Sequence, residues 1–232
     1  MTVMPPKLQP SEPTVPPLKE GDRLTADEFR RRYEAMPEVN KAELLRGIVY
    51  MPSPVRFEFH TRPHSLATTW LGNYATFTPG AESGPDGSMR LDDENEPQPD
   101  VMLFLPKHAG GQVAISPDDY VTGAPELVFE ISGSTKKRDT GIKKDVYREF
   151  GVKEYLVWRT DDDMIDWFVL RDGNYVPLAA GPDNIHRSEL FPGLWLDAKA
   201  MVECDRVRVF QVLQQGCSTP EHTAFVERLA GK

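Results

Sequence analysis

Short apolar runs, each bounded by proline or polar residues, recur through the middle of the chain. The clearest are residues 101–105 and 127–131, whose length and flanking residues are typical of buried strands. Two more strands are predicted at 154–159 and 165–170, joined by a turn that carries adjacent aspartates. A hairpin is predicted at 43–51 around a tight Arg-Gly turn. Several strands are therefore expected to build the centre of the molecule.

Helical periodicity appears between and after these runs. One amphipathic helix is predicted after Pro63 and another from about Asp139, because apolar residues recur there at four-residue spacing. The core-facing positions are Leu66, Trp70, Leu71, Tyr74 and Phe77 in the first helix, and Ile142, Val146 and Phe150 in the second. Thr25, with Glu28 three residues later, predicts the start of an earlier helix, and Thr219-Pro220 predicts the start of the last one.

Composition and charge narrow the class of protein. Residues 1–21 are rich in proline and predict a disordered arm, whereas residues 22–232 predict a single domain because no internal linker interrupts them. The net charge of −9 means that binding of nucleic acid would require a local basic patch. Cys204 and Cys217 are predicted to be free thiols, which fits a reducing, cytoplasmic compartment. The sequence has no apolar signal core and no apolar run approaching ~18 residues, so no membrane association is expected.

Two of the predicted strands carry a carboxylate where an apolar residue would be expected. Asp100 begins one and Glu130 lies near the end of the other. A buried carboxylate costs several kcal/mol unless it is paired or bound to a cation. On the helix that follows, Asp139, Lys143 and Tyr147 form a second stripe at four-residue spacing that borders the core-facing stripe. These residues together predict a site for a hard metal ion with a cationic helper; the alternative for Asp139 and Lys143 is an ordinary surface pair.

The order of these residues resembles the Uma-two family of "putative restriction endonucleases", which belongs to the PD-(D/E)XK nuclease-fold superfamily. The resemblance covers about residues 24–196. It is carried by Pro99-Asp100, Glu130, the Asp139-x-x-x-Lys143-x-x-x-Tyr147 helix, the stretch from Glu43 to Met51 with the following Ser53-Pro54, and the stretch from Gly151 to Val157. Each motif is weak alone, but their order and spacing together are specific.

The resemblance implies a restriction-endonuclease-like α/β (α+β) fold, with a mixed β-sheet flanked by helices. It also implies hydrolysis of phosphodiester bonds in nucleic acid, DNA being the expected substrate. Asp100 and Glu130 would then hold Mg²⁺ or Mn²⁺, and Lys143 would be the catalytic cation. The superfamily pattern has its lysine two residues after the strand glutamate, where this chain has Ser132. Many nucleases of this fold act in pairs, so a homodimer is expected by analogy.

Other residues are candidates for supporting roles. Glu43 is either a third acidic group of the site or an exposed strand residue paired with Arg46 or Lys41. One of His60 and His64 corresponds to a histidine of the family pattern, and the sequence leaves open which one lines the site. Asp139 and Tyr147 are expected to support Lys143.

A cluster of basic residues offers a candidate contact for a phosphate backbone. It comprises Lys136, Lys137, Arg138, Lys143, Lys144, Arg148 and Lys153. An ordinary solvated helix explains the same cluster equally well. Two further functions remain open: a catalytically silent nuclease-fold domain that binds protein or nucleic acid, and a metal-dependent phosphohydrolase that acts on nucleotides.

Overall fold

A computed structural model describes residues 15–52, 54–133 and 135–231. The greater part of the arm predicted at 1–21 therefore lies outside the described residues. No helix within the described part of the chain is both long and apolar enough to cross a membrane.

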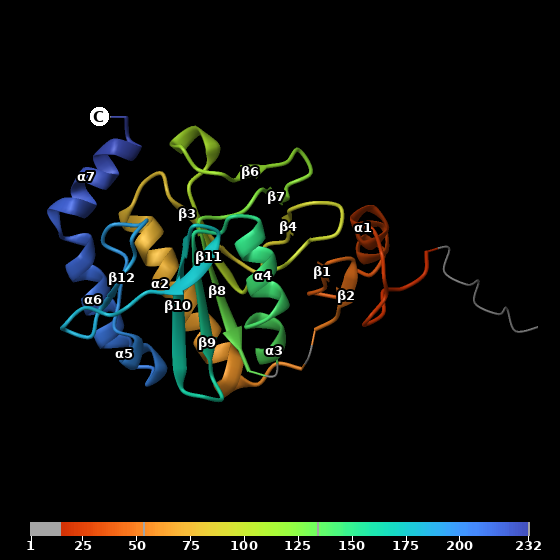
Figure 1. Ribbon diagram of the computed structural model, residues 1–232, viewed down its shortest axis with the longest axis horizontal. Helices are drawn as coiled ribbons and strands as arrows, with labels where there is room; N and C mark the ends of the chain where they lie inside the picture. The colour runs from red at the N-terminus through yellow and green to blue at the C-terminus, as the bar shows by residue number, and fades with distance from the viewer. Residues whose placement is uncertain (1–14, 53, 134, 232) are drawn as a thin grey trace, which may run out of the picture.

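A six-stranded mixed sheet forms the centre of the fold, in the order β11-β10-β9-β8-β5-β3 (Figure 1). Its strands are β3 (Glu82–Pro85), β5 (Val101–Phe104), β8 (Leu127–Ser132), β9 (Glu154–Arg159), β10 (Met164–Arg171) and β11 (Asn174–Pro177). Only β8 and β9 pair in parallel, and the other neighbours in this sheet are antiparallel. The two outer strands, β3 and β11, have four residues each and both end in proline.

Helices cover both faces of this sheet (Figure 1). On one face, α2 (Arg62–Phe77) packs together with the C-terminal helices α5 (Ala198–Val202), α6 (Arg206–Cys217) and α7 (Pro220–Leu229). On the other face lie α3 (Lys136–Asp139) and α4 (Ile142–Glu149), which connect the parallel strands β8 and β9. The expected mixed sheet flanked by helices is therefore confirmed.

Smaller elements surround this core. Helix α1 (Ala26–Glu34) and the hairpin of β1 (Glu43–Leu45) and β2 (Ile48–Tyr50) pack together at one end of the molecule (Figure 1). A π-helical turn, η1 (Phe57–Thr61), precedes α2, and a 3-10 turn, η2, spans Lys107–Ala109. The remaining strands are β4 (Met89–Arg90), β6 (Ala114–Ile115), β7 (Val121–Thr122), β12 (His186–Arg187) and β13 (Trp195–Leu196).

The local signals in the sequence produced the expected turns and caps. Arg46 and Gly47 both have positive φ, at 51° and 72°, as a tight hairpin turn between two twisted strands requires. The Thr25 hydroxyl accepts a hydrogen bond from the backbone N–H of Glu28 and caps α1. Thr219 caps α7 in the same way. Cys204 and Cys217 are free thiols, as predicted.

Two expectations about helices are wrong. The helix expected from Asp139 is two helices, because the chain breaks at Thr140 and Gly141 between α3 and α4. A Cβ on Gly141 would lie 2.6 Å from the Lys137 carbonyl oxygen, so the sharp bend there requires glycine. Phe77, which was expected in the core, is the last residue of α2 and is exposed.

Candidate active site

Asp100 and Glu130 lie next to each other on neighbouring strands. Asp100 immediately precedes β5, and Glu130 is in β8. The antiparallel register pairs Val101 with Phe129, so the next step along the ladder brings Asp100 opposite Glu130. The alternation of side chains along β8 directs Phe129 and Ile131 towards α2 and its neighbours, and directs Val128 and Glu130 to the face covered by α4.

Asp100 is a buried carboxylate that is held as an anion. Its Oδ2 accepts a hydrogen bond from the backbone N–H of Ile131 at 2.7 Å, and its Oδ1 lies 2.7 Å from the Lys41 Nζ. The His60 Nε2 is 4.0 Å from the same Oδ1. Burial alone would raise the pKa of Asp100, but the charges of Lys41 and Lys143 lower this pKa below its ordinary value.

Lys143 joins two further carboxylates inside the fold. Its Nζ lies 2.7 Å from an oxygen of Glu43 and 2.7 Å from an oxygen of Glu130, and the lysine side chain is only 1% exposed. Burial alone would lower the pKa of Lys143, but Glu130 and Glu43 hold it above its ordinary value. The Tyr147 hydroxyl donates to the same Glu130 oxygen at 2.8 Å, and the backbone N–H of Gln98 donates to Glu43 at 2.9 Å. Lys143 therefore fixes Glu43 and Glu130 in place.

Asp139 lies at the end of α3, where the helix breaks. The Thr135 hydroxyl donates a hydrogen bond to its carboxylate, and the Arg138 Nε lies 3.7 Å from its Oδ1. The Tyr155 hydroxyl donates to the Asp139 backbone carbonyl at 2.7 Å, which anchors the helix end to β9. Burial raises the pKa of Asp139 above its ordinary value.

Negative charge exceeds positive charge in this cluster. The buried carboxylates are Glu43, Asp100, Glu130 and Asp139. The cationic side chains that face them, among the described residues, are Lys41, Lys143 and Arg138. Burial and the neighbouring carboxylates, opposed by Lys143, raise the pKa of Glu130 to about 8. One carboxylate therefore needs either a proton or an additional cation.

The donors present fit a hard divalent cation. Asp100 and Glu130 offer oxygen ligands, which Mg²⁺ and Mn²⁺ prefer. Among the described residues, Glu130 Oε2 accepts no hydrogen bond, whereas Lys143 and Tyr147 both contact its Oε1. The Lys41 ammonium is paired with Asp100 Oδ1, so a metal ion there would displace it or share the carboxylate with it.

The acidic cluster lines a cleft of about 350 Å³. Its polar lining includes Asp100, Glu130, Asp139, Lys41, Arg138 and His60. The lining also includes Pro52, Pro54, Val55, Arg56, Phe59, Gly133, Thr135 and Asp161. The carboxylates are therefore reachable from this cleft, although each is itself nearly buried.

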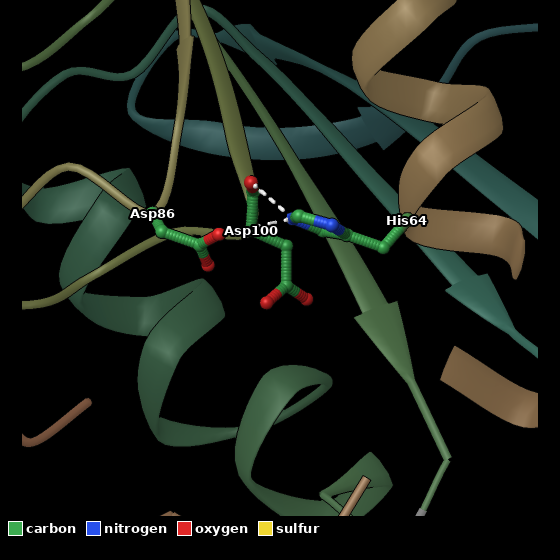
Figure 2. Close-up of side chains that lie close together, drawn as sticks. All are labelled: His64, Asp86 and Asp100. Atoms are coloured by element: carbon green, nitrogen blue, oxygen red, sulfur yellow. Dashed lines mark hydrogen bonds and ion pairs between the residues drawn. The ribbon is translucent and has the colours of Figure 1, made fainter. Parts of the chain in front are cut away.

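His64, Asp86 and Asp100 form a second group whose donor atoms lie within 4.8 Å of one another. Figure 2 shows the Asp100 carboxylate pointing away from the imidazole while its backbone carbonyl faces it. The His64 Nε2 lies 2.9 Å from that carbonyl oxygen and therefore carries the proton of this hydrogen bond. The same nitrogen is 3.5 Å from Asp86 Oδ2, so the His64 Nε2 already faces two oxygen partners.

The structure brings together most of the residues that the sequence singled out. Glu43, Asp139 and Tyr147 join Asp100, Glu130 and Lys143 in one network. Glu43 is buried rather than exposed and pairs with Lys143, whereas Arg46 pairs with Glu149. Both histidines lie beside Asp100: their rings stack 5.6 Å apart, His60 faces the carboxylate and lines the cleft, and His64 contacts the backbone.

The predicted basic patch is divided by the fold, which corrects that expectation. Lys143 and Arg138 point inwards to carboxylates. Lys136 pairs with Asp162, Arg148 with Glu149, and Lys144 covers the ring of Phe168. Of this cluster, Lys137 and Lys153 are exposed, and the other side chains are buried or half-buried.

Sequence reasoning missed the role of three residues. Lys41 was considered only as a partner of Glu43, yet it pairs with Asp100. Arg138 was counted as a surface residue, and Asp86 was not considered. The spacing of Lys41 two residues before Glu43 was the one available signal, since alternate residues of an extended chain share a side.

Comparison with known proteins places the chain among nuclease-like folds. Residues 26–199 match the model of the Uma2 family, which is described as "Putative restriction endonuclease". The fold is similar to that of a solved protein described as "a putative nuclease belonging to DUF820 from Anabaena variabilis ATCC 29413". The two chains share 14% sequence identity with a TM-score of 0.52, and the match covers 77% of this chain and 99% of the other. No curated protein matches the chain significantly.

Proposed function

Because the chain belongs to the Uma2 family, we propose that it is a metal-dependent endonuclease that hydrolyses phosphodiester bonds of nucleic acid, with DNA as the expected substrate. The observation that carries the proposal is the pair of neighbouring carboxylates, Asp100 and Glu130, at the floor of a cleft where negative charge is in excess. Asp100 and Glu130 would hold Mg²⁺ or Mn²⁺. Such an ion, when bound, supplies activation of a water molecule and stabilisation of charge on phosphorus.

Lys143 and Lys41 have different roles at the site. Lys143 is buried between Glu43 and Glu130, so it orients both carboxylates and compensates their charge. Tyr147 and Gln98 hold the same carboxylates from other directions. Lys41 is partly exposed and lines the cleft beside Asp100, so its ammonium is a cation that a substrate phosphate can meet next to the carboxylates. Lys143 therefore supplies a fully buried positive charge, and Lys41 supplies one that is partly exposed.

A cleavage assay with matched variants tests this function. Plasmid and single-stranded DNA are incubated with Mg²⁺ or Mn²⁺ and wild type, Asp100→Asn or Glu130→Gln, and metal binding is measured by calorimetry. Both variants should lose cleavage and metal binding. Glu126→Gln is the control, because Glu126 is also buried but accepts its hydrogen bonds from the backbone of Leu105 and Gln112, away from the cleft. Absence of both cleavage and metal binding in the wild type would overturn the proposal.

A second function has one specific observation in its favour. Both oxygens of Asp100 already have partners, Ile131 and Lys41, and Ser132 stands where the superfamily pattern has its lysine. A domain that binds nucleic acid without cutting it would tolerate this arrangement. Nucleic-acid binding that is unaffected by divalent metal, together with no cleavage, would support this alternative. Cleavage of mononucleotides as fast as of polymers would instead indicate a nucleotide phosphohydrolase.

A further inference from the structure

Exposed apolar side chains border the cleft at residues 55–59, which we call the lip. Val55 is 67% exposed, Phe57 61% and Phe59 42%. Val55 and Phe59 also line the cleft that contains Asp100 and Glu130. Large apolar side chains gathered at the mouth of a polar cleft mark a contact surface, because exposed aromatic rings are unfavourable in water.

Arginine side chains lie over the aromatic rings of the lip. The Arg56 guanidinium is 5.8 Å from the centre of the Phe59 ring, and the Arg62 guanidinium is 5.2 Å from the centre of the Phe57 ring. Arg62 also pairs with Glu58, whereas Arg56 has no carboxylate partner among the described residues. In a chain with a net charge of −9, an unpaired guanidinium at this position favours a ligand that carries both negative charge and flat rings.

The lip is held in place relative to the acidic cluster. The Thr160 hydroxyl, at the end of β9, donates a hydrogen bond to the Phe59 carbonyl at 2.9 Å. Directly after the lip, the backbone N–H groups of His60 and Thr61 both donate to the Arg56 carbonyl, which closes the π-helical turn. His60, the next residue after Phe59, lies 4.0 Å from Asp100. A ligand stacked on Phe59 is therefore positioned next to the carboxylates.

We propose that the lip binds unpaired bases of a nucleic-acid strand, with Phe59 stacking on a base whose phosphate enters the cleft. This inference rests on the proposed function and assigns its substrate class: single strands, or duplexes with an unpaired segment. In a continuous duplex each base face is covered by its neighbours, so only an unpaired base can offer its face to a phenylalanine ring. The adjacent Arg56 suits the strand's phosphates and can itself stack on a base.

The test separates base stacking from phosphate contact. Binding of three labelled probes is measured by fluorescence anisotropy with Ca²⁺ in place of Mg²⁺: an oligothymidine, an abasic strand of the same length, and a blunt duplex. Wild type is compared with Phe59→Ala, Phe59→Tyr and Phe59→Leu. Phe77→Ala is the matched control, since Phe77 is a comparably exposed phenylalanine that does not line the cleft.

Base stacking on Phe59 predicts a specific pattern of binding among these variants and probes. Phe59→Ala should weaken oligothymidine binding by about 5- to 150-fold, the range for loss of one base–aromatic stack. Phe59→Tyr should retain binding, Phe59→Leu should not restore it, and the abasic strand should bind wild type and Phe59→Ala equally. Phe77→Ala should bind as wild type does.

Other outcomes overturn the proposal, and one of them leaves the nuclease function intact. If wild type cleaves plasmid in Mg²⁺ but Phe59→Ala binds oligothymidine normally, the lip is not a base-stacking surface and the nuclease proposal stands. If Phe59→Leu restores binding, or if Phe59→Ala changes the molar mass in solution, the lip makes a general apolar contact, with a second copy of the chain in the latter case. If wild type neither binds nor cleaves any of these nucleic acids, both proposals fail.

Discussion

Replacement of Lys143 by methionine tests the charge balance of the buried cluster. Methionine has nearly the same length and an apolar end, so the main change is the loss of one ammonium group. Glu43 and Glu130, each 2.7 Å from that ammonium, would then lie buried without it. Removal of one partner from a buried ion pair costs about 3–5 kcal/mol, because the remaining charge is uncompensated. For a domain of this size, this loss corresponds to a decrease in melting temperature of about 6–20 °C.

Urea and thermal unfolding, followed by circular dichroism, measure the effect. Lys144→Met is the control, because Lys144 is the next residue of the same helix but lies over the Phe168 ring, outside the acidic cluster. Its replacement should cost no more than about 1 kcal/mol. The double variant Lys143→Met/Glu130→Gln should be more stable than the sum of the two single effects predicts, because the glutamine removes a charge that the lysine had compensated. A loss below about 1 kcal/mol in Lys143→Met would refute the conclusion that this lysine holds the cluster together.

Two other predictions follow from the fold. Gly141→Ala should destabilise the protein by about 1–3 kcal/mol in the same unfolding assay, since its Cβ would lie 2.6 Å from the Lys137 carbonyl oxygen. Gly84→Ala is the control, because a Cβ there meets no described atom within 4 Å, and it should change the free energy of unfolding by less than about 0.5 kcal/mol. Equal effects of the two substitutions would contradict this reasoning. Burial raises the pKa of Cys217 to about 11, so alkylation of this thiol in a Cys204→Ser background should be slow at pH 8 and should rise about tenfold per pH unit up to pH 10. A rate that levels off below pH 9 would show that the thiol is not protected.

The sequence predicted the carboxylates of the site better than their partners. Asp100 and Glu130 stood out because a charged residue in an apolar strand must be compensated by a partner, and such a residue can be recognised from the sequence alone. Lys143 was found through its four-residue spacing from Asp139 and Tyr147. The helix break at Gly141 alters that geometry, but the three side chains still reach the same cluster.

Partners that depend on how separate elements dock were not predictable. Lys41 comes from the segment before β1 and reaches Asp100 because β1 packs beside α4. Arg138 looked like a surface cation, since a count of charges does not show which side of a helix faces buried carboxylates. The exposure of Phe57 and Phe59 was likewise hidden, because an apolar residue in a sequence is expected to be buried until the fold places it otherwise.

The short outer strands of the central sheet have a consequence for self-association. An edge strand offers unpaired N–H and C=O groups, which invite another chain to continue the sheet. β3 and β11 each present only four residues, and their terminal residues, Pro85 and Pro177, have no N–H to donate. A second copy adding to either side would therefore gain few ladder hydrogen bonds, which protects the protein against edge-to-edge aggregation.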